Sequence, residues 1–189
     1  MGKGQKIACK WRKDRALVFL DGERVKILER TTEAIALPAK ENIRLSILAE
    51  NMGRINFGPN MFEKKGIDGA TVAYVSGRVL HGWKNISLPM QNLDDLLYGE
   101  LKAADTPAFF RASFFVDEKK DTFLKPSGFG KGFALINGIN VGRFYNDAGP
   151  QKTLYVPKSF LKDGENELII FNSDGLREIY AEFVAAPSL

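Results

Sequence analysis

The apolar residues of this chain fall into short runs of strand length that are separated by turn residues. The runs lie at residues 16–20, 43–48, 71–75, 109–116, 133–136, 153–156 and 167–171. Between them stand the pairs Asp21-Gly22, Asn137-Gly138, Asp163-Gly164 and Asp174-Gly175. Asp-Gly and Asn-Gly pairs tolerate the positive φ values that two-residue hairpin turns require. Many short strands joined by tight turns are typical of an all-β protein.

One segment has helical rather than strand periodicity. Leu93, Leu96, Leu97 and Leu101 lie at helical spacing, and Asn92 stands in the position of an N-cap. We therefore predict a short helix over residues 93–101, which would serve as a connector between β-regions.

The chain also repeats itself in three segments that occur in the same order. The paired segments are 18–25 with 134–141, 36–38 with 155–157, and 45–48 with 168–171. Their offset grows from 116 to 123 residues along the chain, as loop insertions in the second copy would produce. Antiparallel hairpins must bury one face, so two tandem β-sandwiches satisfy the pattern. The alternative is that any two hairpins resemble each other at this level.

Composition narrows the classes of function. Cys9 is the only cysteine, which excludes an intrachain disulfide and a cysteine metal cluster. His81 is the only histidine, so a hydrolytic triad or a zinc site would lack partners. We expect no cofactor and no metal.

Neither the charge pattern nor the hydropathy of the chain favours binding to nucleic acid or insertion into a membrane. The net charge is +4, and its one cluster lies at the start, in Lys3, Lys6, Lys10, Arg12 and Lys13. Such a cluster could contact nucleic acid, but it is more often a solvated tail. No apolar stretch has the roughly 18 residues of a membrane span, and residues 1–13 do not form a signal peptide. We expect a cytoplasmic location.

Several longer motifs resemble those of a known family. They lie at residues 14–22, 45–58, 65–69, 121–124, 130–132, 137–144 and 149–157. In this order they resemble the C-terminal β-region of family 35 glycoside hydrolases, the β-galactosidases. The resemblance covers residues 14–171 and implies an all-β fold of two tandem jelly-roll, galactose-binding-like β-sandwiches with a short helical connector.

The resemblance also implies a domain organisation. We place the boundary within residues 77–83, which gives one sandwich at 1–80 and a galactose-binding-like jelly roll at 81–189. The first sandwich is expected to be incomplete at its N-terminal side. The family's catalytic (β/α)₈ barrel, which supplies both catalytic carboxylates, lies before the region of resemblance.

No catalytic residue is predicted in this chain. Retaining glycoside hydrolysis needs two carboxylates about 5–5.5 Å apart. The neighbouring acids Asp117 and Glu118 would point to opposite faces of a strand and cannot form such a pair on one face. The chain alone is thus expected to be no enzyme, although the parent protein would be a β-galactosidase.

Two groups of residues are candidates for contact with a sugar. The resemblance implies that Phe57, with Asn56 beside it, reaches back to line the galactose pocket of the barrel. A Tyr is common at this position in the family, so Phe57 would keep the ring face and lose the hydroxyl contact.

The second group lies on one loop of the second half. Phe144 and Tyr145 stand near Asn140 and Arg143, which combines flat apolar faces with orienting polar groups. We predict a substrate contact at these four residues. The alternative is that the rings pack in the core, as most aromatic side chains of a sandwich do.

The favoured function is that of non-catalytic accessory domains, which would brace the barrel of a β-galactosidase and line part of its galactose pocket. The alternative is a standalone carbohydrate-binding module for galactosides, and a third option is a chain that associates with a separately encoded barrel subunit. Expected partners are the catalytic barrel domain or subunit, a galactoside ligand, or a second copy of the chain in a homodimer.

The bracing function predicts an exposed apolar patch. Met52, Phe57, Met61 and Phe62 lie within eleven positions of a segment rich in Gly and Asn. Loops of that composition lie on the surface, where four large apolar side chains favour an interface. The alternative is that the loop folds back and buries them in its own sandwich.

Overall fold

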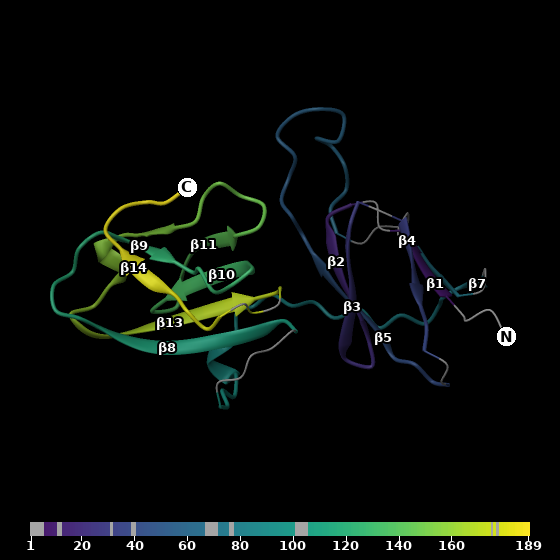
Figure 1. Ribbon diagram of the computed structural model, residues 1–189, viewed down its shortest axis with the longest axis horizontal. Coiled ribbons are helices and arrows are strands. Elements are labelled where there is room, and N and C mark those ends of the chain that lie inside the picture. Colours follow the sequence, from purple (N-terminus) through teal and green to yellow (C-terminus); the bar gives the residue numbers. More distant parts are fainter. Residues whose placement is uncertain are drawn as a thin grey trace. The chain divides into compact units, whose positions relative to one another are not determined.

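The computed structural model describes residues 6–10, 13–30, 32–38, 41–66, 72–75, 78–100, 106–174, 176 and 178–189. Within these residues the regular structure consists of fourteen strands and two short 3-10 turns (Figure 1). The chain divides into two compact units, Met1–Pro89 (unit 1) and Met90–Leu189 (unit 2). The prediction of an all-β chain built from β-sandwiches is confirmed. The assignment of residues 1–80 and 81–189 to the two sandwiches stays a prediction.

Unit 1 consists of two sheets. The strands are β1 (Lys6–Lys10), β2 (Arg15–Leu20), β3 (Glu23–Glu29), β4 (Thr32–Ala36), β5 (Leu45–Glu50), β6 (Val72–Val75) and β7 (Arg78–Val79). The sheet orders are β3-β2-β5 and β4-β1-β6-β7. Ile7 of one sheet packs with Ala16 and Val18 of the other in a shared buried cluster, so the two sheets face each other across a core.

Unit 2 repeats this plan. Its strands are β8 (Ala108–Val116), β9 (Thr122–Lys125), β10 (Lys131–Ile136), β11 (Ile139–Tyr145), β12 (Leu154–Val156), β13 (Gly164–Asn172) and β14 (Glu182–Val184). The sheet orders are β11-β10-β13-β8 and β12-β9-β14. Leu124 and Leu154 of the smaller sheet meet Ile136 and Ile170 of the larger one in the core.

The two units share details that a chance likeness of hairpins would not reproduce. The β2–β3 turn has positive φ at Asp21 (52°) and Gly22 (93°), and the β10–β11 turn has it at Asn137 (50°) and Gly138 (79°). Each hairpin also has one register shift. The first lies between Val18 and Phe19, and the second lies at the equivalent place between Ala134 and Leu135.

The first turn residue of each hairpin is also bonded to the third strand in the same way. Asp21 donates its N–H to the Arg44 carbonyl and accepts the Arg44 N–H on Oδ1, at 2.8 and 2.9 Å. Asn137 does the same with Glu167, at 3.0 and 3.1 Å. Turn, bulge and third-strand contact thus agree, which supports an internal duplication.

The predicted helix over residues 93–101 is wrong beyond its first turn. Helical structure covers only Leu93–Asp95, as a 3-10 turn, and Asn92 forms no side-chain cap. Leu96 is already extended, with φ −72° and ψ 129°, and Leu97 is fully exposed. A nine-residue helix is unstable unless its apolar stripe packs on another element, and Leu97 has no such surface. Leu101 lies outside the described residues.

Among the described residues, no helix combines the length and the apolar character that crossing a bilayer needs. The cytoplasmic location stays a prediction. Within that same part of the chain, His, Cys, Asp and Glu side chains form no group of three that could hold a metal ion. Lys3 and Arg12 of the basic cluster, and Gly175 of the predicted turn, lie outside it.

Candidate functional site

A long loop leaves unit 1 after β5. It spans residues 51–66 and extends past the ends of the strands of its unit, as the blue-to-teal segment in Figure 1 shows. Neither strand nor regular helix occurs in it. Its shape therefore depends on specific polar contacts, which lie at its two ends and along its length.

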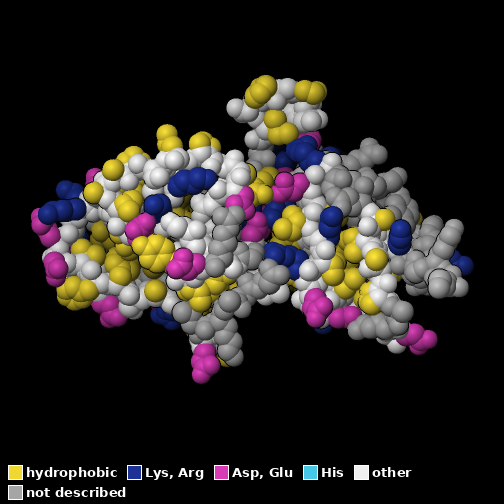
Figure 2. Space-filling model, viewed as in Figure 1, with side chains coloured by type: hydrophobic (Ala, Val, Ile, Leu, Met, Phe, Trp, Pro, Cys, Tyr) yellow, Lys and Arg dark blue, Asp and Glu magenta, His cyan; other side chains and the backbone are white. Residues whose placement is uncertain are grey.

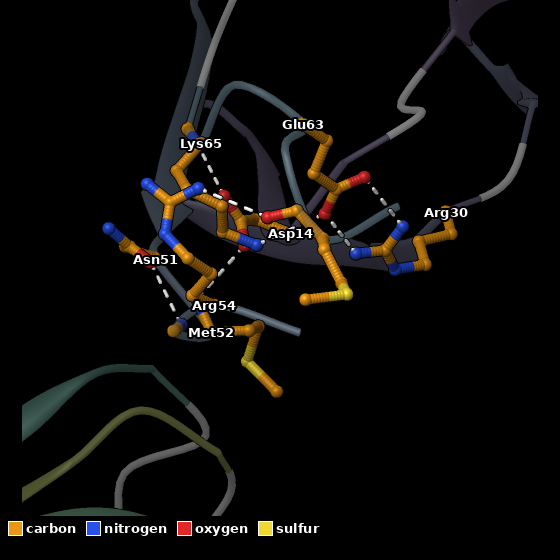
Figure 3. Close-up of polar contacts among 10 residues, drawn as sticks. Asp14, Arg30, Asn51, Met52, Arg54, Glu63 and Lys65 are labelled. Carbon is orange, nitrogen blue, oxygen red and sulfur yellow. Dashed lines mark hydrogen bonds and ion pairs between the residues drawn. The ribbon is translucent and has the colours of Figure 1, made fainter. Parts of the chain in front are cut away.

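One carboxylate holds both ends of this loop. Asp14, next to the start of β2, accepts the N–H of Met52 on Oδ1 at 3.1 Å and the N–H of Gly66 on Oδ2. The ammonium of Lys65 forms an ion pair with Oδ1. Figure 3 shows these groups converging on Asp14, whose carboxylate is buried. We call this arrangement the Asp14 clamp.

The Asp14 carboxyl is ionised within this clamp. Burial by itself raises its pKa, because desolvation disfavours the charged form. The hydrogen bond from Gly66, the contact with Lys65 and the hydrogen bond from Met52 together outweigh burial and lower the pKa below its ordinary value. The charge is thus part of what keeps the two ends of the loop together.

A second ionic group supports the loop from β3. Arg30, which follows β3, donates to both carboxylate oxygens of Glu63, with Nη1 3.0 Å from Oε2. Lys65 Nζ also lies 3.2 Å from Glu63 Oε1, so Lys65 joins this pair to the Asp14 clamp (Figure 3). The Arg30 hydrogen bond is the main cause that lowers the pKa of Glu63 to about 2.

Internal hydrogen bonds shape the rest of the loop. Asn51 Oδ1 accepts the N–H of Gly53 at 2.8 Å, and Arg54 Nη1 donates to the Met61 carbonyl at 3.2 Å. The N–H of Met61 also bonds to the Gly58 carbonyl at 3.3 Å. A loop whose ends are held together and whose interior is bonded in this way has the character of an Ω-loop.

The outer part of the loop is apolar. The Phe57 side chain is 78% exposed and Phe62 is 88% exposed, while Met52 is exposed and Met61 half-buried. Figure 2 shows hydrophobic side chains, in yellow, at the outer end of this loop. The predicted surface patch is therefore present, and the alternative in which the loop buries these rings is wrong. Asn56 is likewise exposed beside Phe57.

The second predicted group lies within strand β11 of unit 2, so its predicted placement on a loop is wrong. Because side chains alternate along a strand, the four residues do not share one face. Phe144 is buried in the core, with its ring centroid 6.4 Å from that of Phe129. Tyr145 is half-buried under the Lys131 ammonium, 5.1 Å from the ring centroid. Arg143 and Asn140 are exposed, and Asn140 Oδ1 accepts the N–H of Gly142. A sugar contact at these residues stays a prediction.

The residues that hold the loop were not singled out from the sequence. In the sequence Asp14 and Lys65 stand out only as parts of the motifs 14–22 and 65–69, and no local pattern indicates the pairing of Arg30 with Glu63. One local signal exists, because Glu63 and Lys65 are charges of opposite sign close to the end of a loop that also contains large apolar side chains. Asp14 and its ionic partner Lys65 still lie far apart in the sequence, as do Asp14 and Gly66, which are 52 positions apart, and no local pattern encodes such contacts.

Two family models match consecutive parts of this chain. Residues 3–89 match the family model described as "Beta-galactosidase, first all-beta domain", and residues 107–166 match "Beta-galactosidase, galactose-binding domain". The chain carries two β-domains of the β-galactosidase family. Both matched models describe accessory β-domains of these glycoside hydrolases. The resemblance seen in the sequence is thereby confirmed.

The similar individual proteins are named as beta-galactosidases or as beta-galactosidase-like proteins. The chain is 40% identical to beta-galactosidase 17 of Arabidopsis thaliana over an alignment of length 162, which covers 74% of this chain and 23% of the relative. It is 34% identical to beta-galactosidase 8 of Oryza sativa subsp. japonica, over 84% of this chain and 30% of that protein. For human beta-galactosidase-1-like protein 2 the identity is 37%, over 84% and 26%. The chain thus spans less than a third of these relatives' length.

Proposed function

We propose that this chain supplies the non-catalytic β-domains of a β-galactosidase and braces the catalytic domain through the loop 51–66. The catalytic domain would be the partner of the chain, either in the same polypeptide or as a separate subunit. The chain by itself would hydrolyse no substrate.

One observation carries the proposal. Phe57 and Phe62 are largely exposed on a loop that the Asp14 clamp holds in a fixed shape. Burial of a Phe side chain in an interface contributes about 1.5–3 kcal/mol, so leaving two rings in water is unfavourable for a free domain. A preformed loop also loses little conformational entropy when it docks. Both properties support a protein interface at this loop.

We further propose that Phe57 and Asn56 line one wall of the galactose pocket of the partner domain. The apolar face of a galactose ring can stack on the phenyl ring of Phe57, and the Asn56 amide can bond to a hydroxyl. The exposure of both side chains supports this role. A homodimer through the same loop is the competing use of the surface.

A chimaeric enzyme tests the proposal. In beta-galactosidase 17 of Arabidopsis thaliana, the region that matches this chain would be replaced by residues 1–189. We expect Phe57→Ser in the chimaera to raise KM for a β-galactoside, because a wall of the pocket is lost. Phe62→Ser is expected to lower the Tm of the catalytic part while KM stays near that of the unmodified chimaera.

Leu97→Ser provides the matched control, because Leu97 is fully exposed but lies outside the loop. It removes an apolar side chain that is even more exposed than Phe57 and Phe62, and it is expected to leave KM and Tm unchanged. If Phe57→Ser and Leu97→Ser behave alike in an active chimaera, Phe57 does not line the pocket. If Phe62→Ser also leaves Tm unchanged, the loop is not a brace.

A further inference from the structure

Strand β8 forms one edge of the larger sheet of unit 2, whose order is β11-β10-β13-β8 (Figure 1). In the part of the chain that the structure describes, no strand pairs with its other side. Ala112, at the middle of β8, is exposed, and so are its neighbours Arg111 and Ser113. A nine-residue, largely apolar strand with an uncovered edge is a ready template for pairing with another strand.

The backbone groups that face this edge follow from the hydrogen bonds of the sheet. Asn137 donates its N–H to the Glu167 carbonyl, which lies opposite it in the continued β10–β13 register, so the odd-numbered residues of β13 bond to β10. The even-numbered residues of β13 then bond to β8, and their partners in β8 are also even-numbered. The N–H and C=O groups that point outward therefore belong to Phe109, Arg111, Ser113 and Phe115.

The sequence of β8 is nearly symmetric about its middle residue. The residues two and three positions away from Ala112 are Phe on both sides, and those four positions away, Ala108 and Val116, are both aliphatic. In an antiparallel pair of two β8 strands centred on Ala112, each Phe therefore lies opposite a Phe of the other strand. Such self-complementarity is what a two-fold axis between identical chains requires.

Both faces of the sheet gain contacts from this pairing. Phe115 is 73% exposed, and it would lie opposite Phe109 of the second copy. Phe109 already belongs to a row of rings, with its centroid 4.9 Å from that of Phe171, so the row would continue across both chains. On the other face, Phe110 and Phe114 pack at the margin of the core and would pair in the same way. Aromatic side chains directly opposite each other stabilise antiparallel strands.

Charge selects this register over its neighbours. Centred on Ala112, the pair places the Arg111 side chain opposite the Ser113 hydroxyl of the second copy. A shift of two residues in one direction would place Arg111 opposite Arg111, and like charges in that position are unfavourable. A shift in the other direction would place Arg111 opposite Phe115 and break the aromatic pairs. Within its own chain Arg111 forms an ion pair with Glu167 of β13, so its guanidinium is directed away from the edge.

We propose that two copies of this chain associate through β8, antiparallel and centred on Ala112, so that the two larger sheets of unit 2 become one continuous sheet. Each of the four residue pairs formed by the outward groups exchanges two backbone hydrogen bonds. The contact is the strand edge and not the loop 51–66, so the inference does not rest on the proposed function.

Sedimentation velocity over a range of chain concentrations tests the proposal. We expect a dimer whose Kd is raised at least about tenfold by Ser113→Pro, because each dimer then loses two hydrogen bonds. The Ser113 N–H points outward, so proline at this position leaves the ladder with β13 intact. Ser113→Thr keeps the N–H and is expected to leave Kd nearly unchanged. Circular dichroism of Ser113→Pro verifies that the variant stays folded.

Disulfide formation tests the register. In a Cys9→Ser background, Ala112→Cys should crosslink two copies under oxidation. The two residues 112 form a non-hydrogen-bonded pair across the axis, with their Cα atoms about 4.5 Å apart, which suits a disulfide. Ser113→Cys is the matched control, because residue 113 is also exposed but lies opposite residue 111 of the second copy. We expect it to crosslink much less.

Three results would overturn the proposal. The first is a chain that stays monomeric at every concentration. The second is a dimer that Ser113→Pro leaves intact and that Phe57→Ser disrupts, which would place the contact on the loop 51–66. The third is equal crosslinking of the two cysteine variants, which would contradict a pair centred on Ala112.

Discussion

Asp14 connects distant parts of unit 1 through three contacts on one carboxylate. Met52 and Lys65 lie at opposite ends of the loop, and both reach Asp14. Asp14 itself has a positive φ of 55°, a conformation that Asp and Asn tolerate better than most residues. The loop therefore depends on the charge and the backbone conformation of a single residue.

Replacing this charge should loosen the loop. Asp14→Asn keeps the size and tolerates the backbone conformation but places an amide where the Met52 and Gly66 N–H groups donate. We expect unit 1 to lose about 2 kcal/mol of stability, the scale of buried hydrogen bonds to a charged group. Denaturant unfolding and faster exchange of the Met52 and Gly66 amides would measure the effect.

Asp121→Asn is the control for that change. Asp121 also accepts a backbone N–H, from Lys158 at 2.8 Å, but it is exposed. Asp121→Asn is therefore expected to lower the free energy of unfolding clearly less than Asp14→Asn does. Equal effects of the two variants would show that the Asp14 clamp contributes no more than a surface contact.

The ionic pair at Glu63 should make the loop sensitive to acid. The pKa of Glu63 falls from 4.5 to about 2 in the fold, mainly because Arg30 donates to the carboxylate. A lowered folded pKa means that the contribution is present above about pH 4.5 and is lost as the pH falls toward 2. NMR titration should show the Glu63 carboxyl near 2 and growing exchange of loop amides across this window.

Glu63→Gln separates this effect from other acidic groups. The variant cannot ionise, so the part of the acid-induced loosening that stems from Glu63 should be absent, and the loop should already be looser at neutral pH. A Glu63 carboxyl that titrates near 4.5 would contradict the pairing with Arg30.

The tight turns are the elements whose role follows most directly from local conformation. Gly22 and Gly138 have φ of 93° and 79°, and an added Cβ would meet no atom within 4 Å at either position. Substitution therefore costs backbone strain rather than a clash. We expect Gly22→Val and Gly138→Val each to destabilise its own unit by about 1 kcal/mol or more, as measured by thermal unfolding.

Gly99→Val is the matched control for the turns. Gly99 also has open space around its Cβ position, but its φ lies outside the left-handed region. It should be neutral. A damaging Gly138→Val beside a neutral Gly22→Val would argue that the two hairpins are not equivalent.

At the scale of the whole molecule, the chain should lack hydrolytic activity. Purified protein incubated with a chromogenic β-galactoside is expected to release no more product than buffer, since no carboxylate pair suited to the reaction was found in the sequence. Activity that co-purifies with the chain and disappears on changing one Asp or Glu would contradict this expectation.

Sugar binding distinguishes the accessory role from a standalone binding module. A ligand that binds the folded state raises stability by about 2.7 kcal/mol at a hundredfold excess over its Kd. We expect no Tm shift with galactose or lactose. A shift that is absent with glucose and is removed by Tyr145→Ala, in a variant that stays folded, would instead support a galactoside-binding module.

Much of the fold could be predicted because its signals are local. Every predicted strand run overlaps an observed strand, and the pairs Asp21-Gly22 and Asn137-Gly138 form the expected turns. Turns depend on the dihedral angles that their own residues allow, and strands depend on the alternation of apolar and polar side chains. Both can therefore be predicted without knowing which distant residues they contact. The exposed rings at Phe57 and Phe62 followed from the composition of their loop.

The features that the sequence missed depend on partners far along the chain. The leucine pattern at 93–101 favoured a helix, but no surface covers Leu97, so only one turn forms. Asp14 acquires its role only when folding brings Gly66 beside it. By itself the sequence determined strands, turns and family, because these depend on neighbouring residues, and the tertiary structure decided which distant residues hold the loop 51–66 together.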